Sequence, residues 1–321
     1  MAVGARRIAI VGADDPVGEA LLQDLSELPQ APGSIIPVSL DEAEGCVRYG
    51  DEDLPCLTPA DVEWSAVQLA IIAACGPGAV RLAHDLLGRG CRVLAVSGLL
   101  PPTADTLLTE VHAAPAEAII RVVRPLLRGA ALRSLSGFIG LPVGARGRVG
   151  IDELVNQSRA LFAIESVESE AFPVQIAFNL LPQVGEIGQD GGSALEAGLC
   201  RTLRGLWGEG LVTQFTAAWI PTFYGGVVAL HGQSKSGLNR EEMQARLAHV
   251  PGVLVMNAPQ PGAAPTPATD GVDSTDVVLG RLKLDDPDGL HFSIWLTYDH
   301  PRLEALQLRL GLEKLIESGL N

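Results

Sequence analysis

Two glycines near the start of the chain, Gly12 and Gly18, have the spacing of a turn that binds nucleotide phosphates. Gly12 ends an apolar, β-branched run typical of a buried strand, and an amphipathic helix pattern surrounds Gly18. Backbone N–H groups at such a helix N-terminus bind the pyrophosphate of a dinucleotide. Gly12 would make the tight turn, and Gly18 would let the helix pack closely on the sheet. The pattern therefore predicts a dinucleotide-binding turn.

Three residues between these glycines oppose phosphate binding. Asp15 occupies the position where a phosphate would approach the backbone, with Asp14 before it and Pro16 after it. Two carboxylates at a helix N-terminus suit the helix dipole but repel a phosphate, and Pro16 removes one N–H donor. Two interpretations follow: a turn that binds a nucleotide, or a structural turn that is capped by its own acids and has no ligand.

Acidic residues also follow the second expected strand, at Asp41, Glu42 and Glu44. A site for the 2′-phosphate of NADP needs Ser or Arg at this point, whereas a single acid binds the ribose of NAD. We assign no cofactor; if one binds, the charges favour NAD, held by Asp41 or Glu42, over NADP. The alternative is that these carboxylates are solvated on a loop.

The five cysteines show neither a metal-binding nor a disulfide pattern. No two of them form a CxxC pair, no Cys/His spacing suits a metal, and an odd, scattered set does not make a disulfide framework. We therefore predict reduced thiols and no metal site. The cysteines are Cys46, Cys56, Cys75, Cys91 and Cys200.

The elements that would position these residues alternate between strand and helix in the first third of the chain. Short Gly-rich turns separate them, as in a doubly wound parallel α/β sheet of the Rossmann type. The predicted strands are Arg7–Gly12, Ile35–Ser39, Val67–Ala74 and Cys91–Ser97, and the predicted helices are Val17–Leu28 and Ala79–Leu87.

The pattern changes after about residue 115, where strands follow one another without regular helices between them. Such an order predicts an α+β unit with a mixed or antiparallel sheet. The strands are predicted at Ala131–Ile139, Phe215–Tyr224, Val227–His231, Gly252–Val255, Asp276–Leu284 and Leu290–Thr297, and helices at Ile151–Phe162 and Arg302–Ser318.

Length and composition restrict the class of protein. A chain of 321 residues suits two domains, and 47% hydrophobic with only 19% charged residues excludes a disordered chain. The formal net charge of −15 disfavours nucleic acid as a partner. No apolar run reaches membrane-spanning length, and the N-terminus does not resemble a signal peptide. We predict a cytoplasmic protein without nucleic-acid or membrane partners.

Four segments in the second part of the chain resemble the aspartate-semialdehyde dehydrogenase family, in that family's order and at about its spacing. The opening turn from Arg7 to Gly18 resembles the family's glycine turn, and the resemblance covers nearly the whole chain. Loops at Gly76 and Ser97 fall where the family has its next two cofactor-side loops. The four segments are Gln175–Ile187 (QIAFNLLPQVGEI), Ile220–Gly226 (IPTFYGG), Pro265–Asp270 (PTPATD) and Asp276–Leu282 (DVVLGRL).

The resemblance implies a Rossmann domain at residues 1–120, completed by the C-terminal helix within 299–321, and an α+β dimerisation domain at 121–298. It therefore implies a homodimer through the second domain. Members of this family act in amino-acid biosynthesis. They reduce an acyl phosphate to a semialdehyde, usually with NADPH. A cysteine forms a thioester, a histidine acts as acid and base, and arginines hold the substrate carboxylate.

The family's catalytic groups do not match this sequence. The nucleophilic cysteine lies in an Asn-Cys-Ser/Thr motif that opens a helix, just before a segment resembling Arg124–Gly129. Here that segment directly follows Ala118–Val123, which looks like a strand, so we expect the stretch carrying the nucleophile to be absent. The position of the family's histidine holds Gly226, and that of its substrate arginine holds Trp219. A basic C-terminal motif is also altered, at Asp299–Leu303.

Two residues are candidate substitutes for the lost groups. Cys75 ends a predicted strand at the edge where α/β sites form, and His231 follows the family's histidine position on the same predicted strand. Their structural alternatives are a small buried hydrophobic residue and a surface histidine. Arg146 and Arg148 lie in a loop that approaches the family's active site, where they would either bind an anion or be solvated.

Three interpretations of function remain open. The first is a degenerate homologue that has lost the dehydrogenase chemistry and is retained as a dimeric binding or regulatory protein, with a small-molecule or nucleotide ligand not excluded. The second is an active NAD(P)-dependent semialdehyde dehydrogenase with a rearranged site. The third is that the expected missing stretch is a gap in the sequence.

Overall fold

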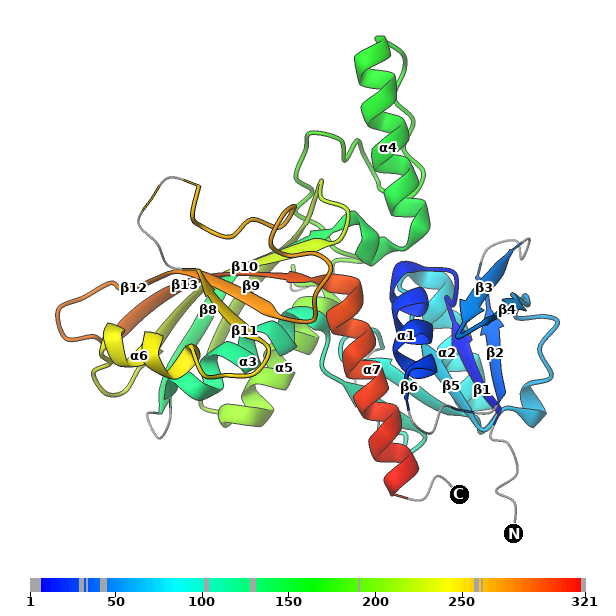
Figure 1. Cartoon of the computed structure of the whole chain (residues 1–321), viewed down its shortest axis with the longest axis horizontal. Coiled ribbons are helices and arrows are strands. Elements are labelled where there is room, and N and C mark those ends of the chain that lie inside the picture. The colour runs from blue at the N-terminus through cyan, green and yellow to red at the C-terminus, as the bar shows by residue number, and fades with distance from the viewer. Residues whose placement is uncertain are drawn as a thin grey trace.

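The computed structural model describes residues 7–28, 32, 34–40, 45–100, 104–127, 131–189, 191–256, 260 and 262–318. Asp41 lies outside these described residues. Two separate β-sheets, linked by the C-terminal helix, make up most of the fold (Figure 1). One is parallel and the other is mixed, which confirms the predicted fold class. In the described part of the chain, no helix has the length and apolarity needed to cross a membrane.

The N-terminal sheet is fully parallel and has the order β2-β1-β5-β6-β7. The chain passes from β1 to β2 on one side and then crosses to β5 on the other side of β1. A topological switch point therefore lies between β1 and β5. A short antiparallel hairpin, β3–β4, follows β2. The strands are β1 (Arg7–Val11), β2 (Ser34–Val38), β3 (Cys46–Tyr49), β4 (Glu52–Pro55), β5 (Leu69–Ile72), β6 (Arg92–Val96) and β7 (Leu108–Val111).

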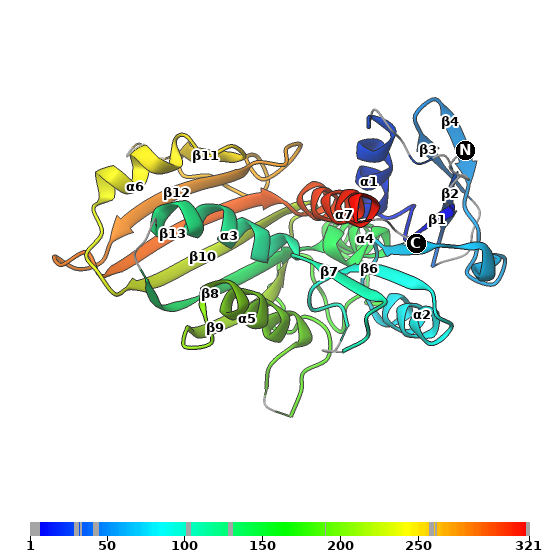
Figure 2. The same cartoon turned by 90° about the horizontal axis from the view of Figure 1, so that it is seen from below.

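Helices cover both faces of this sheet. Helix α1 (Pro16–Ser26) and the C-terminal helix α7 (His300–Glu317) share one buried cluster with the sheet, and α2 (Pro77–Gly88) shares another with the opposite face. The strands are apolar on both faces because helices bury both. Helix α7 begins directly after the last strand of the second sheet and packs on the first one (Figure 2).

The second sheet has the order β11-β12-β13-β10-β8-β9. Its pairs β8–β9 and β11–β12 are parallel, and the others are antiparallel. Three helices, α3, α5 and α6, pack on one face of this sheet (Figure 2). Their bounds are α3 (Ala114–Leu127), α5 (Ala194–Trp207) and α6 (Arg240–Leu247), and the strands are β8 (Leu132–Pro142), β9 (Val212–Ile220), β10 (Gly225–Ser234), β11 (Val253–Met256), β12 (Val277–Leu284) and β13 (His291–Asp299).

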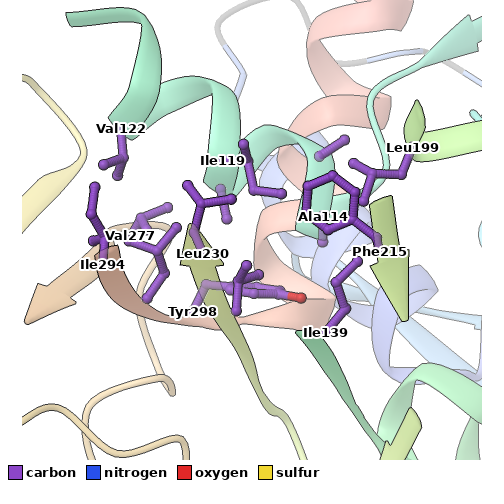
Figure 3. Close-up of a cluster of buried hydrophobic side chains, with 14 of the residues drawn as sticks. Ala114, Ile119, Val122, Ile139, Leu199, Phe215, Leu230, Val277, Ile294 and Tyr298 are labelled. Atoms are coloured by element: carbon purple, nitrogen blue, oxygen red, sulfur yellow. The ribbon is translucent and has the colours of Figure 1, made fainter. Parts of the chain in front are cut away.

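Helix α3 corrects one prediction, because Ala118–Val123 is helical and not a strand. The run looks like a strand because it is almost continuously apolar. In the structure these apolar residues belong to a wide face of α3 that is buried against the sheet and neighbouring helices, while Glu117, Arg121 and Arg124 form a narrow polar face that is not fully buried. Figure 3 shows Ile119 and Val122 of α3 facing Leu230 and Ile294 of the sheet.

Helix α4 (Arg148–Ala163) stands away from both sheets (Figure 1). The segment that returns from its tip is bound along it through two buried side chains. The carboxylate of Glu153 accepts the backbone N–H groups of Glu170, at 2.8 Å, and of Ala171. The amide of Gln157 donates to the Glu168 carbonyl at 2.8 Å. These bonds fix the return segment against α4.

Candidate functional site

The predicted phosphate turn is closed by another part of the same chain. The loop before α4 lies on it, so that the backbone N–H of Arg148 donates to Oδ1 of Asp15 at 2.8 Å. The Arg148 guanidinium donates to the Asp14 carbonyl at 3.2 Å and to the Glu19 carboxylate at 2.6 Å. A Cβ at Gly147 would collide with the Asp15 carboxylate. The segment around Gly147 therefore occupies the space in front of the turn.

The two acids of the turn are hydrogen-bonded to other parts of the chain. Asp15 is the N-cap residue of α1, but its side chain makes no capping hydrogen bond and binds Arg148 instead. Asp14 accepts the Ser39 hydroxyl at 2.6 Å. Gly12 has φ +76°, as the tight turn requires, and Gly18 packs directly on the Gly12–Ala13 backbone. The arrangement does not fit a pyrophosphate, because a carboxylate and a neighbouring loop already occupy its place.

The turn after β5 is closed in the same way. Gly76 is the N-cap of α2 with φ +97°, and the guanidinium of Arg146 lies against it, so a Cβ at this position would have to displace the guanidinium. The Cys75 thiol donates to the Ala145 carbonyl, with 2.7 Å between sulfur and oxygen. Desolvation raises the pKa of Cys75 to about 12, although the charge of Arg146 acts in the opposite direction. Cys75 is therefore a protonated thiol at neutral pH, which argues against a role as nucleophile.

Two other residues of the predicted site, Ser97 and His231, lie in different parts of the fold. Ser97 is buried and its hydroxyl oxygen accepts the Thr202 hydroxyl at 3.3 Å, which links β6 to α5. His231 is exposed on the second sheet, about 17 Å along β10 from Gly226. The structure therefore does not bring His231 to Cys75, which contacts the loop before α4.

His231 belongs to a chain of polar side chains on the sheet surface. Its Nδ1 lies 2.8 Å from the hydroxyl oxygen of Ser293, its cross-strand neighbour, and Ser293 donates to the Asp285 carboxylate. Lys283 pairs with Asp285 at 2.6 Å. The serine lies between the histidine and the carboxylate, so the histidine cannot be oriented by the carboxylate and activate the serine, as it does in a hydrolase triad.

The helix that was expected to be missing is present. Helix α3 begins at Ala114 and runs into Arg124–Leu127, the segment that resembles the one following the family's nucleophile. Its first turn contains Ala114, Pro115 and Ala116, all buried. The Ala114 N–H donates to the Glu304 carboxylate at 3.3 Å. Proline and Glu117 in the first turn, with Arg124 in the last, are helix signals that could have identified this element from sequence.

A tyrosine takes up the space beside Gly226. A Cβ added to Gly226 would lie 2.7 Å from Cζ of Tyr298, whose ring is fully buried. Among the described residues, the Tyr298 hydroxyl and Nδ1 of His300 are the buried side-chain polar atoms that have no hydrogen-bond partner. Burial raises the pKa of Tyr298 well above its usual value, so the phenol stays protonated. Trp219 is also buried, with its ring edge-to-face against Phe172 at 5.3 Å.

A cavity of about 750 Å³ lies beside the closed turns, between α2, α4 and the return segment of α4. Cys75, Gly78 and Arg146 are among the residues that line it. Its size is that of a small-molecule site. Among the residues that the structure describes, no group of three His, Cys, Asp or Glu side chains could hold a metal ion.

Comparisons with known proteins agree with this architecture. The sequence profile of the semialdehyde dehydrogenase dimerisation domain matches residues 125–300, more than half of the chain. An aspartate-semialdehyde dehydrogenase from Legionella pneumophila is 25% identical over 330 residues, which cover 97% of this chain and 95% of that protein. A USG-1 protein homolog from Pseudomonas aeruginosa is 28% identical over 324 residues, which cover 93% of this chain and 94% of that protein.

A solved structure of an aspartate semialdehyde dehydrogenase has the same fold. The crystal structure of aspartate semialdehyde dehydrogenase II from Vibrio cholerae matches with a TM-score of 0.84. The match covers 98% of this chain and 99% of that one at 20% sequence identity, so it shows a shared fold. Together with the profile match over more than half of the sequence, these findings show that the chain belongs to the aspartate-semialdehyde dehydrogenase family.

Proposed function

We propose that this family member has lost the dehydrogenase chemistry and acts as a dimeric binding or regulatory protein. The observation that carries the proposal is the start of α3. The resemblance puts the nucleophile at the opening of this helix, and the chain has Ala114 there, followed by Pro115. A methyl group cannot form a thioester, and Pro115 also removes one N–H donor from the helix N-terminus.

Three further features support loss of the activity. The position of the family's acid–base histidine is Gly226, and Tyr298 occupies the adjacent space with a phenol that stays protonated. The position of the substrate arginine is Trp219, which is neutral and buried. The turn for a dinucleotide pyrophosphate is closed by the contact between Asp15 and Arg148. Each change removes a separate part of the reaction.

An activity assay tests this proposal. Purified protein, free of host enzyme, should form no NADPH or NADH from aspartate semialdehyde, phosphate and oxidised cofactor. The Legionella pneumophila relative, prepared in the same way, serves as the positive control. Cofactor reduction that follows the purified protein, and that is lost in a Cys75→Ala or a His231→Ala variant, would instead support an active enzyme with a rearranged site.

We also propose that two copies associate through the face of the second sheet opposite α3. The helices α3, α5 and α6 pack on the other face, and the match to a dimerisation domain covers all strands of this sheet. A loop of the same chain lies on part of the proposed interface, where the Trp295 indole donates to the Pro265 carbonyl at 2.9 Å. Residues that alternate with the buried core positions point outward, among them Ala229 and His231 at the centre and Val212, 63% exposed, at the edge. A broad sheet face of this kind is suited to packing against a second sheet.

A charge at the centre of this face should separate the copies. Ala229→Arg is expected to convert a dimer at micromolar concentration into a monomer, because an unpaired guanidinium would be buried between the two sheets. Light scattering coupled to size exclusion measures the mass. Gln23→Arg, on the exposed side of α1, is the matched control and should remain dimeric. A monomeric wild-type protein, or a dimeric Ala229→Arg variant, would contradict this interface.

A further inference from the structure

Helix α4 and the segment that returns from its end form an arm, residues 148–180, which projects beyond the second sheet. Figure 1 shows the helices α3, α5 and α6 below this sheet and α4 above it, and the view from below in Figure 2 places the same three helices in front of the sheet. The arm therefore rises on the side of the sheet face that was proposed above to contact a second copy. A copy that packs on that face lies beside the arm.

The arm carries the three most exposed large hydrophobic side chains in the described part of the chain. Ile164 is 95% exposed, Phe162 79% and Phe178 69%, and we call these three residues the arm tip. The rings of Phe162 and Phe178 pack edge to face with their centroids 5.7 Å apart, and Ile164 directly follows the end of α4. Val174 and Leu180, about half exposed, lie on the same return segment. Single exposed apolar residues are normal on a protein surface, but a group of this size marks an interaction surface.

Buried hydrogen bonds hold the arm tip in place. The side chain of Gln157 is buried, and its oxygen accepts the backbone N–H groups of Ile176, at 2.8 Å, and Ala177, at 3.0 Å, directly before Phe178. Glu153 and the amide nitrogen of Gln157 fix the earlier part of the return segment in the same way. A surface that is already ordered loses little conformational entropy when it binds, so the arm tip is preorganised for a contact.

Neither burial nor backbone preference explains an isoleucine at position 164. Ile164 is the C-cap of α4 and has φ +60°, in the left-handed region that glycine or asparagine commonly occupies at helix ends. A β-branched side chain is strained in this region. A single copy therefore has both a strained backbone and an exposed apolar side chain at this point. A contact that covers the side chain would offset these costs.

The sheet face beside the arm presents mainly small or polar side chains to a partner. Ser136, Gln214 and Thr216 are exposed or partly exposed on it, and the ring of Phe138 beside them is half-buried. Stable interfaces depend mainly on a few large apolar or aromatic anchors. The arm tip supplies such anchors on the same side of the sheet, and the match to a dimerisation domain, residues 125–300, includes the arm. A second copy of this chain is therefore the partner that the arm fits.

We propose that the arm is a clasp: in the dimer, the tip of each arm packs on the second copy, next to the contact between the two sheets. The sheets position the copies, and the apolar side chains of the two tips supply much of the binding free energy. The formal net charge of −15 disfavours an anionic membrane or nucleic acid as the occupant of this surface. The inference rests on the proposed function, because it extends the interface proposed there and gives the arm a role in association.

Protection of a thiol measures whether the arm tip is covered. Glu165→Cys places a thiol beside the three apolar side chains and leaves them in place, since Glu165 is exposed and directly follows Ile164. With a maleimide, this thiol should react roughly tenfold or more slowly in the dimer than in the monomer, which is obtained by dilution or with Ala229→Arg. Cys46, exposed on β3 of the first sheet, is an internal control and should react equally in both states. Mass spectrometry of the digested protein separates the two thiols.

Substitutions at the arm tip test its contribution to association. Phe162→Ser combined with Phe178→Ser should raise the dissociation constant of the dimer roughly tenfold or more, because full burial of one such ring is already worth about that factor. Both rings are exposed, so the fold should persist, which circular dichroism checks. Leu206→Ser is the matched control, because Leu206 is 44% exposed on α5, which packs on the opposite face of the sheet. It should leave the dissociation constant unchanged when all variants are compared by sedimentation over a dilution series.

Ile164→Gly separates the proposed role from a purely structural one. Glycine relieves the strained backbone, so it should raise the melting temperature of the monomeric Ala229→Arg variant. In the otherwise unchanged chain, the same substitution should weaken the dimer, because it removes an apolar contact. A side chain that only supports the arm would lower both the melting temperature and the affinity.

The opposite results overturn the inference. A dimer in which the Glu165→Cys thiol reacts as fast as in the monomer has an uncovered arm tip, and a dimer that tolerates the double serine variant does not depend on the tip. Either result would refute the clasp and leave both the loss of dehydrogenase chemistry and the contact between the sheets in place. A monomeric wild-type protein would refute the clasp together with that contact. Cofactor reduction in the enzyme assay would refute only the proposed loss of chemistry.

Discussion

Replacing Gly226 by histidine is expected to lower the free energy of unfolding by about 1–3 kcal/mol, and by less when Tyr298 is alanine. The reason is the contact described above: the new Cβ would lie 2.7 Å from Cζ and 2.9 Å from the hydroxyl oxygen of Tyr298. Both atoms belong to a side chain that is fully buried, so the tyrosine cannot move away at low cost.

A double-mutant cycle measured by urea denaturation quantifies this conflict. Tyr298→Ala alone should cost about 3–5 kcal/mol, as truncations of large buried rings do. The double variant should be more stable than the sum of the single effects predicts, by about 1 kcal/mol or more. Additivity within about 0.5 kcal/mol would show that position 226 has free space. Strong coupling would mean that the family's histidine cannot be restored here unless the tyrosine is also removed.

Gly18→Ala should destabilise the protein by about 3 kcal/mol, whether or not a nucleotide is present. A Cβ at this position would collide with the Gly12 carbonyl oxygen and lie 2.7 Å from Cα of Ala13. These are backbone atoms of the turn, so helix α1 would have to move away from the sheet. The requirement for glycine is therefore one of packing, and it persists even though the turn is closed to phosphate.

Gly88→Ala is the matched control. Gly88 is the last residue of α2, and no atom lies within 4 Å of the Cβ that alanine would add. Alanine should therefore stabilise the helix, by about 0.5–1 kcal/mol. Urea denaturation of both variants, each with and without NAD, measures the two opposite changes. A neutral Gly18→Ala variant, or one rescued by NAD, would show that this glycine serves a bound nucleotide.

The parallel sheet could be predicted because its signals are local. Runs such as Arg7–Val11 and Leu69–Ile72 are apolar on both faces and end at glycine-rich turns. Helix α3 was predicted wrongly at Ala118–Val123, because this six-residue run, in which only Arg121 is polar, is too short to show the helical period. Pro115 and Glu117 in its first turn and Arg124 in its last turn carried the missing signal.

The candidate site could be predicted only in part, because its closure depends on contacts between distant residues. Asp15 and Arg148 are 133 residues apart in sequence, and their bond follows from the position of α4 on the first sheet. The same holds for Cys75 and Ala145, and for Gly226 and Tyr298. The sequence indicated that Asp15 opposes a phosphate, but not what takes the phosphate's place.

Helix α7 has a consequence for how this protein is synthesised. Ala305, Leu308 and Leu312 complete the core of the N-terminal sheet, and Gly311 packs on Leu94 and Val111. A ribosome makes residues 7–111 first, yet the part of one sheet face beside α1 stays uncovered until α7 has left the exit tunnel. The two halves therefore cannot mature one after the other during translation. The N-terminal half therefore keeps apolar surface exposed until α7 has been made.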